Sequence, residues 1–205
     1  MKVLLINGSP RKGGNTSIAL GEMVKVFEAE GIEAEVMQIG NKAIRGCMAC
    51  GACAKAGKCI FEDDVNIAAA KLKYADGLVV ASPVYYASAN GTLISFLDRL
   101  FQSAKYDKTM KVGAAVAVAR RGGCSATFDE LNKYFTICGM PVASSQYWNS
   151  VHGRVAGEAS QDAEGLQTMR VLARNMAFLI KSIALGKEKY GLPEKEPWNP
   201  THFIR

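Results

Sequence analysis

Four of the six cysteines lie within thirteen positions of one another, and their spacing is suited to metal chemistry. Two successive Cys-x-x-Cys steps are followed by a fourth cysteine after five further residues, giving the set Cys47, Cys50, Cys53 and Cys59. Such a run folds compactly around an iron–sulfur cluster, with the fourth thiolate closing the site. The same thiols could instead bind zinc or remain free in a glycine-rich loop. A disulfide framework is not expected, because no secretory signal is evident.

A second group of residues has the composition of a phosphate-binding loop. Residues 3–6 form an unbroken apolar run that predicts a strand buried on both faces, and the run stops at Asn7. The glycine-rich loop and helix start that follow carry the candidate ligand-binding side chains Ser9, Arg11, Lys12, Asn15, Thr16 and Ser17. The free N–H groups and the dipole at a helix N-terminus favour an anion at this position.

The loop fits one terminal phosphate better than a pyrophosphate. Gly8 and Gly13 have the glycine spacing of a Walker motif, but Gly14 and Asn15 stand where that motif requires Lys and then Ser or Thr. The dinucleotide pattern GxGxxG does not occur in this loop. The alternative is an ordinary strand-to-helix turn in which Ser and Asn act as caps.

Strands and helices alternate along the chain. Apolar runs predict strands at residues 3–6, 77–82 and 112–119, alternation predicts one at 33–39, and a fifth strand is predicted at 142–147. Helical spacing predicts five helices, at residues 16–30, 68–74, 90–103, 126–138 and 164–185. This alternation predicts an α/β three-layer sandwich, in which helices cover both faces of a five-stranded parallel sheet of order 2-1-3-4-5. We expect one domain at 1–185 with a cysteine-rich insertion at 46–60, followed by a polar tail at 186–205 that carries Trp198 and Phe203 as isolated aromatics.

The predicted topology brings three loops to one edge of the sheet, because ligands bind beyond the carboxyl ends of such strands. One is the phosphate loop. The second spans residues 82–88 and combines a rigid proline with two aromatics, so its candidate ligand-binding residues are Pro83, Val84, Tyr85 and Tyr86. In the third, Gly122 and Gly123 permit close approach of a ring, and Arg121 supplies positive charge. A packed Pro-Tyr turn and solvated arginines are the corresponding structural alternatives.

The stretch NGSPRKGGNTS resembles the phosphate loop of the NADPH-dependent FMN reductase family, a branch of the flavodoxin-like proteins. The stretch SPVYYASANGTLISFLDR resembles the isoalloxazine loop and following helix of that family, and the resemblance extends to about residue 183. It implies that FMN is bound, with Pro83, Val84 and Tyr85 against the flavin. The four-cysteine run is similar to that of the iron–sulfur flavoproteins, which implies a four-iron four-sulfur cluster near the FMN. Many relatives nevertheless carry similar cysteines without a cluster, so the assignment stays open here.

The composition and the charge of the chain limit the kinds of partner that it is expected to bind. The chain has 205 residues, 49% of them hydrophobic, but no apolar run approaches the length of a membrane span. The net charge of +6 comes from scattered basic residues rather than a dense run, so we expect no nucleic-acid partner. We expect a cytoplasmic protein, and the family resemblance implies a homodimer or homotetramer.

Three functions are compatible with these features. The first is an FMN-dependent oxidoreductase in which NAD(P)H reduces a small acceptor such as a quinone or a flavin. The second is an iron–sulfur flavoprotein that carries single electrons from ferredoxin to an acceptor. The third is a non-enzymatic flavin-binding module. No catalytic side chain is nominated, because a flavin accepts hydride by itself. His152 is expected in a loop, and Cys124 and Cys138 are expected to be structural.

Overall fold

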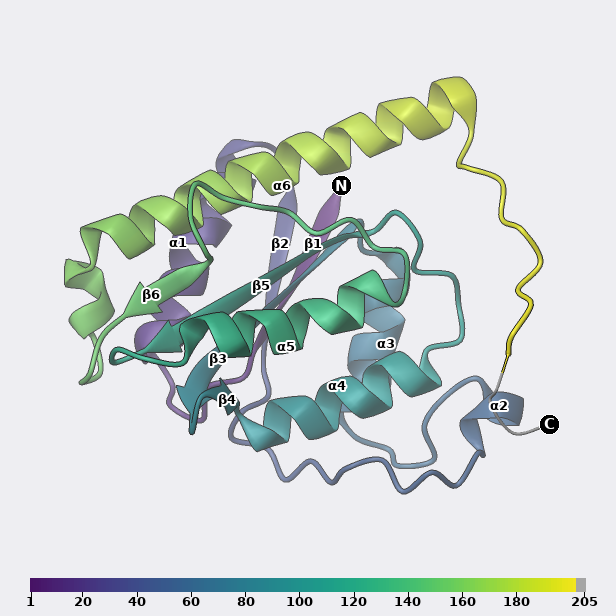
Figure 1. Ribbon diagram of the computed structural model, residues 1–205, viewed down its shortest axis with the longest axis horizontal. Coiled ribbons are helices and arrows are strands. Elements are labelled where there is room, and N and C mark those ends of the chain that lie inside the picture. Colours follow the sequence, from purple (N-terminus) through teal and green to yellow (C-terminus); the bar gives the residue numbers. More distant parts are fainter. Residues whose placement is uncertain (202–205) are drawn as a thin grey trace.

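The computed structural model describes residues 1–201 and contains a sheet between two layers of helices (Figure 1). Five parallel strands run in the order β2-β1-β3-β5-β6, and the two-residue strand β4 pairs antiparallel with the end of β3. The bounds are β1 Lys2–Asn7, β2 Glu33–Gln38, β3 Gly77–Tyr85, β4 Ser88–Ala89, β5 Val112–Ala119 and β6 Ser150–His152. With β4 set aside, this is the predicted order 2-1-3-4-5.

Helices cover both faces of the sheet. One face packs against α1 (Asn15–Ala29) and α6 (Ala163–Tyr190). The other face packs against α3 (Asp64–Tyr74), α4 (Gly91–Ser103) and α5 (Cys124–Thr136). Two short helices, α2 (Cys53–Ala56) and η1 (Glu158–Gln161), lie in connecting segments. Within residues 1–201, no helix has the length and apolar character that crossing a membrane requires.

The apolar run of β1 is buried on both faces, as the sequence predicted. Val3 and Leu5 join the core cluster under α1 and α6, whereas Leu4 and Ile6 join the cluster under α3, α4 and α5. Successive side chains of a strand point to opposite faces, so a strand covered on both sides must be apolar at every position. The central place of β1 fixes the glycine-rich loop at the carboxyl edge of the sheet.

The prediction of a fifth strand at 142–147 was wrong. Only Val142 in that stretch pairs with β5, through an isolated bridge, and parallel pairing resumes at β6. The side-chain amide of Asn149 donates to the backbone oxygen of Ala115 at 3.0 Å, so a side chain holds the chain to β5 between the two points of pairing. His152 therefore ends a strand rather than lying in a loop.

Two other elements extend beyond their predicted ends. β3 continues through Tyr85. The first residues of the predicted second loop, 82–85, therefore belong to this strand, which pairs there with β5 and β4. α6 continues through Gly186 to Tyr190, and residues 191–201 form neither helix nor strand. Trp198 in this segment is exposed, and Phe203 lies outside the described residues.

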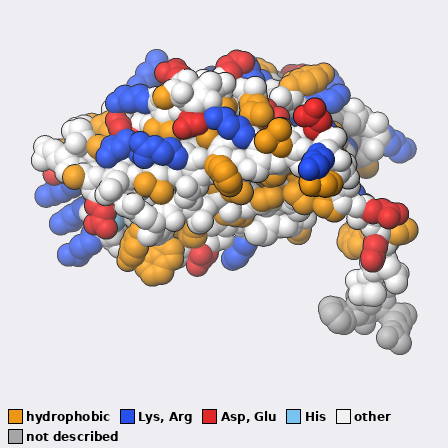
Figure 2. Space-filling view, turned by 90° about the horizontal axis from the view of Figure 1, so that it is seen from above, with side chains coloured by type: hydrophobic (Ala, Val, Ile, Leu, Met, Phe, Trp, Pro, Cys, Tyr) orange, Lys and Arg blue, Asp and Glu red, His pale blue; other side chains and the backbone are white. Residues whose placement is uncertain are grey.

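The surface above the sheet mixes side chains of all kinds. Figure 2 shows basic side chains interspersed with acidic and hydrophobic ones on the face viewed from above. Ion pairs join α6 to the residues of α1 and its C-cap, such as Lys181 with Glu30 at 2.6 Å and Arg170 with Glu22 at 3.2 Å. The positive net charge is thus not gathered into one patch on this face.

Candidate functional site

A cavity of about 180 Å³ opens at the carboxyl edge of the sheet. The glycine-rich loop, the ends of β3 and β5 and the segment after β6 all contribute to its wall. The lining residues are Ser9, Arg11, Asn15, Thr16, Pro83, Val84, Tyr85, Val118, Ala119, Arg120, Gly153 and Arg154. The structure thus brings together seven of the candidate residues, from the first and second predicted loops. Lys12, Ser17, Tyr86, Arg121, Gly122 and Gly123 are not part of this lining.

Helix α1 begins at this cavity with backbone donors that no side chain caps. Its N-cap residue, Gly14, has no side chain, and no other side chain within the described residues caps the helix. In contrast, α3, α4 and α6 are capped by the side chains of Asp63, Asn90 and Asp162. The N–H groups of the first turn of α1, around Thr16, therefore remain available for an anion, which the helix dipole also favours.

Side chains from β1 and α1 hold the glycine-rich loop in shape. The side-chain oxygen of Asn7 accepts a hydrogen bond from the backbone N–H of Ser9, and its amide donates to the hydroxyl of Ser17, both at 3.0 Å. The Ser9 hydroxyl accepts from the backbone N–H of Arg11 at 3.2 Å. A Cβ at Gly8 would lie 3.0 Å from the oxygen of Ala81, so the loop runs against β3. Ser17 thus stabilises the loop through its hydrogen bond with Asn7 and does not line the cavity.

Asn15 connects the glycine-rich loop to the segment after β6. Its side-chain amide donates to the backbone oxygen of Val155 at 2.9 Å, and its side-chain oxygen accepts from the backbone N–H of Ala159 at 3.2 Å. A Cβ at Gly153 would lie 2.7 Å from the same amide nitrogen. Both hydrogen-bonding ends of the Asn15 side chain therefore fix one wall of the cavity.

The second predicted loop is a tight hairpin between β3 and β4. Tyr86 and Ala87 form its turn with φ values of 51° and 60°, a left-handed conformation that residues other than glycine adopt at a cost. The carboxylate of Glu130 on α5 accepts hydrogen bonds from the Ser88 hydroxyl at 2.8 Å and the Ala89 N–H at 2.9 Å. The hairpin is therefore held in place by α5, while the Tyr86 side chain is fully exposed at its tip.

Helix α5 also begins beside the hairpin without a side-chain cap in the described chain. Its N-cap, Gly123, has φ 91°, and a Cβ there would lie 2.8 Å from both the Cα of Ala87 and the Cγ1 of Val84. Glycine is required because the helix start and the hairpin approach so closely. Gly122 precedes it in open space. Arg121 is exposed, and it is the neighbouring Arg120 that lines the cavity.

Among residues 1–201, three arginines and no acidic residue line the cavity. Arg11 comes from the glycine-rich loop, Arg120 from the end of β5 and Arg154 from the segment after β6. Sequence reasoning nominated Arg11 and missed the other two. Arg154 was not predicted because the fifth strand was placed at 142–147. Since β6 ends at His152, residues 153 and 154 lie at the carboxyl edge of the sheet.

His152 and Cys124 are neighbours close to this edge. The Cys124 Sγ lies 3.9 Å from His152 Nε2, and His152 Nδ1 lies 3.6 Å from a carboxylate oxygen of Asp162. Burial raises the pKa of the Cys124 thiol, which favours its neutral form. Asp162 is already engaged, because its carboxylate caps α6 and accepts the backbone N–H of His152 at 2.6 Å. These contacts fit the structural role expected for Cys124.

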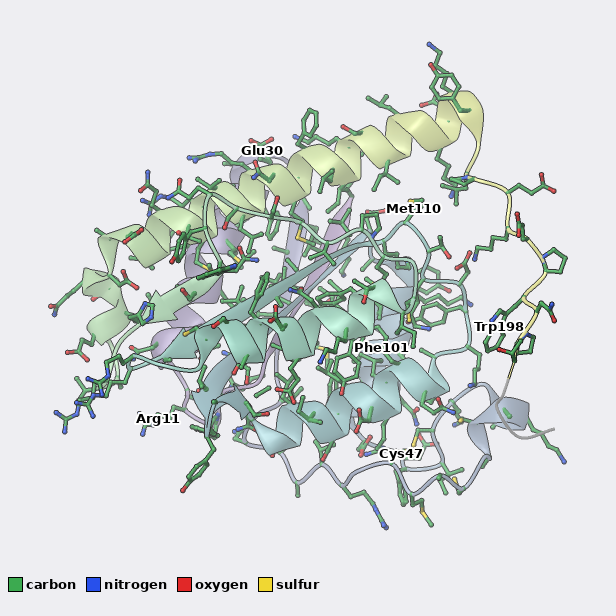
Figure 3. The ribbon with its side chains drawn as sticks, viewed as in Figure 1. Arg11, Glu30, Cys47, Phe101, Met110 and Trp198 are labelled. Atoms are coloured by element: carbon green, nitrogen blue, oxygen red, sulfur yellow. The ribbon has the colours of Figure 1, made fainter. Side chains whose placement is uncertain are left out.

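A second, larger cavity of about 570 Å³ lies beside the cysteine-rich segment. All four spaced cysteines line it, together with residues from the far ends of α4 and α5 such as Phe101 and Tyr134. In Figure 3, Arg11 lies at the lower left of the molecule, beyond the start of α4, whereas Cys47 lies below the later half of α4. A helix of thirteen residues is about 20 Å long at 1.5 Å per residue. Within one chain, the two cavities are therefore separate sites.

A buried charged residue, Arg99, lines the cysteine cavity and is 1% exposed. Its guanidinium donates two hydrogen bonds to the sulfur of Cys59, from Nε at 3.4 Å and from Nη2 at 3.2 Å. It also binds both oxygens of Asp63, at 2.6 and 3.0 Å. Burial opposes the charge of Arg99, but the hydrogen bonds that it donates to Asp63 and Cys59 raise its pKa above the usual value.

The donor set of this cavity suits an iron–sulfur cluster, because its lining carries four thiols. Within the described residues, no three side chains of the metal-binding types converge on one point. The cavity nevertheless holds four thiols, a guanidinium aimed at one of them, and the buried hydroxyl of Ser103, which has no hydrogen-bond partner within residues 1–201. Cys138 shares the lining, and burial raises its pKa.

Comparison with known proteins agrees with this geometry. Residues 1–154 match the family described as NADPH-dependent FMN reductase. The chain is 35% identical to an iron–sulfur flavoprotein of Methanocaldococcus jannaschii over 191 residues, covering 89% of this chain and 99% of that protein. It is 32% identical to an iron–sulfur flavoprotein of Methanosarcina thermophila, covering 92% and 100%.

Solved structures agree on the fold. A flavodoxin from the domain Archaea superimposes with a TM-score of 0.61 at 17% identity, covering 88% of this chain and 99% of that one. The strand order and the helices on both faces are those of a flavodoxin-like protein. The chain therefore belongs to the NADPH-dependent FMN reductase family, and its relatives within that family include proteins named iron–sulfur flavoproteins.

Proposed function

We propose that this protein is an FMN-dependent oxidoreductase that takes hydride from NAD(P)H and reduces a small acceptor such as a quinone or a flavin. The observation that carries this proposal is the pairing of two uncapped helix starts, at α1 and α5, with a cavity lined by three arginines and no acid. That arrangement suits a phosphorylated ring compound, with the phosphate at the start of α1.

Different residues of the cavity would bind different parts of the cofactor. The loop side chains Ser9, Arg11 and Thr16 would hold the phosphate, and Pro83 to Tyr85 would lie against the ring. Gly122 and Gly123 would admit the ring edge beside α5. The flavin supplies the hydride-accepting chemistry when it is bound, so the protein needs to bind, orient and shield it.

The test begins with the colour of the purified protein. We expect bound FMN that can be released, identified and rebound with quenching of its fluorescence, and we expect oxidation of NADH or NADPH when a quinone is added. Protein that neither carries FMN nor binds it on addition would refute the proposal. Flavin binding without turnover by NAD(P)H or by reduced ferredoxin would favour a non-enzymatic flavin-binding module.

The second candidate function is that of an electron carrier with a four-iron four-sulfur cluster held by Cys47, Cys50, Cys53 and Cys59, accepting electrons from ferredoxin. It is favoured by the shared cavity of these thiols, by the guanidinium directed at Cys59, and by the relatives named iron–sulfur flavoproteins. A cluster transfers single electrons, which a simple hydride relay does not require.

Anaerobic reconstitution with iron and sulfide distinguishes the two candidates. A cluster predicts four iron and four sulfide per chain in the wild type and their loss in Cys53→Ser. Cys124→Ser is the matched control, because Cys124 lies outside the cysteine cavity and should keep full iron content. Wild-type protein that binds FMN but holds no iron after reconstitution would exclude the electron carrier with a cluster. The NAD(P)H-dependent enzyme would then be the remaining candidate.

The protein is also proposed to form a homodimer or homotetramer. Large apolar side chains are exposed on the outer part of α6, with Phe178 at 70%, Leu185 at 66% and Tyr190 at 78%. Such residues on one long helix are suited to burial against another copy. Light scattering would test this, and a monomer at the concentrations used for assays would contradict it.

A further inference from the structure

The position of Arg99 is unusual for a charged residue. It occupies α4 among the buried residues Phe96, Leu100 and Ser103, on the side of the helix that faces the cysteine-rich segment. Arginine is almost never fully buried unless its charge is paired, because removing a charge from water is costly. The groups around Arg99 must therefore balance its charge and accept hydrogen bonds from its guanidinium.

Asp63 compensates the charge and fixes the guanidinium. Two parallel hydrogen bonds join Arg99 to the two oxygens of Asp63, which is the strongest arrangement for this pair. Asp63 is itself fixed, since its carboxylate caps α3 by accepting the N–H of Val65 at 3.1 Å. The Phe61 ring lies 5.0 Å from the guanidinium carbon of Arg99. The orientation of Arg99 is thus set by groups other than the cysteines.

With the guanidinium fixed in this way, Nη1 also donates to the backbone oxygen of Arg45 at 3.4 Å, and the donors on the other side point at one sulfur. Nε and Nη2 both lie within 3.4 Å of the Cys59 sulfur. A neutral thiol is a weak acceptor, whereas a thiolate attracts a cation and two donors strongly. The Cys59 sulfur receives two donors from one buried cation. This arrangement suits a sulfur that carries negative charge, and a sulfur that binds a cluster carries such a charge.

We propose that Arg99 is a positioning residue that sets the reduction potential of the cluster through the sulfur of Cys59. This inference rests on the proposed four-cysteine cluster and assigns to it a residue outside the ligand set. Reduction adds one electron, and hence negative charge, to the cluster. A cation hydrogen-bonded to a ligand sulfur stabilises the reduced form more than the oxidised form, so Arg99 raises the potential.

The experiment is a potentiometric titration of the anaerobically reconstituted protein, followed by electron paramagnetic resonance. Arg99→Gln keeps a hydrogen-bonding amide but removes the charge, and we expect its cluster to be harder to reduce. The reduced-to-oxidised ratio at a fixed potential should fall about tenfold, which corresponds to about 59 mV for one electron. Arg99→Lys keeps the charge without the paired donors and should lie between Arg99→Gln and the wild type.

Asp63→Asn provides a change of opposite sign. Asn caps helices as well as Asp does, so α3 should keep its start, while the loss of the carboxylate leaves the Arg99 charge uncompensated. The potential should then rise above that of the wild type. Arg45→Gln is the matched control, because the Arg45 guanidinium lies over the same Phe61 ring at 5.0 Å but its side chain is exposed. Its potential should equal that of the wild type.

Each outcome decides the proposal. Iron-containing Arg99→Gln and Asp63→Asn proteins whose potentials match that of Arg45→Gln would overturn it and leave Arg99 a packing residue. Should Arg99→Gln fail to fold, as judged by loss of FMN and of cooperative unfolding, the shifts of Arg99→Lys and Asp63→Asn decide in its place. Wild-type protein without iron would refute the cluster itself, which is a separate failure that iron analysis detects before any titration.

Discussion

The side chain of Asn15 donates a hydrogen bond to the backbone oxygen of Val155 at 2.9 Å, although the two residues are 140 positions apart. This bond, together with the one from the N–H of Ala159, ties the start of α1 to the segment that carries Arg154. The shape of the cavity thus depends on a side chain that stands beside the proposed phosphate position.

Asn15→Ala should therefore weaken FMN binding. Two hydrogen bonds are lost, each contributing about 0.5–1.5 kcal/mol, and the wall at 153–159 is released. We expect the dissociation constant of FMN to rise about tenfold, as measured by fluorescence quenching. Asn175→Ala is the control, since the Asn175 amide donates to the backbone oxygen of Ser144 at 2.8 Å, outside the cavity lining. Equal affinity in both variants would contradict the role of Asn15.

Arg11→Gln should discriminate between FMN and riboflavin. If the guanidinium binds the phosphate, its loss weakens FMN binding by about tenfold, because a hydrogen bond to a charged group contributes about 1.5–3 kcal/mol. Riboflavin has no phosphate, so its affinity should not change. Arg174→Gln removes the same charge from an exposed position on α6 and serves as the control. A parallel loss of affinity for both flavins would place the phosphate elsewhere.

Gly8→Ala should destabilise the protein. The new Cβ would lie 2.7 Å from Leu93 Cδ2 and 3.0 Å from the oxygen of Ala81, in a core that cannot easily give way. Overpacking of this kind costs about 1–3 kcal/mol. Gly21→Ala is the matched control, because nothing lies within 4 Å of a Cβ there and α1 should gain about 0.5–1 kcal/mol. Urea unfolding measures both, and a stable Gly8→Ala protein would show that the loop can move away from β3.

Glu22 should contribute stability that is lost in acid. The hydrogen bond from Lys25 lowers the pKa of Glu22 most, burial acts against it, and the bond from Arg170 lowers it further. A carboxyl with a lowered folded-state pKa stabilises the protein above its unfolded value of about 4.3, and the contribution disappears as the pH falls through the folded value.

Glu22→Gln should accordingly be about 0.5–1 kcal/mol less stable than wild type at neutral pH. The difference in the free energy of unfolding should shrink as the pH falls below the ordinary pKa of a glutamate and through the lowered pKa of Glu22 in the folded protein. Urea unfolding at several pH values measures it. A difference that stays constant with pH would mean that Glu22 acts through packing rather than charge.

Much of the fold follows from local pattern. The apolar run at 3–6 and the small apolar residues at 112–119 predict strands covered on both faces, and the structure places β1 and β5 there. A strand is predicted at 142–147, yet its pairing with β5 is limited to the bridge at Val142. Asn149 then holds the chain to β5 through its side-chain amide, which donates to Ala115, and through its backbone oxygen, which accepts from the N–H of Ala117 at 2.9 Å. Such a long-range bond leaves no signal in the periodicity.

The sequence predicts some residues of the cavity lining and not others, for a similar reason. The glycine-rich loop and Pro83 to Tyr85 carry their chemistry in consecutive residues, so the sequence predicts them. Arg154 reaches the cavity only through the tertiary position of β6, and Arg99 stands within an otherwise apolar helical stripe. The one signal for Arg99 was its spacing, three residues after the buried Phe96, where a cation requires a partner.

The uncapped starts of α1 and α5 have a consequence for the protein without its flavin. Amides left without an acceptor make the first turns of both helices prone to fray, and a ligand that binds only the folded chain shifts unfolding by mass action. Cofactor loss and loss of heat resistance should therefore go together. A deflavinated sample should melt at a lower temperature and regain its resistance as FMN is titrated back.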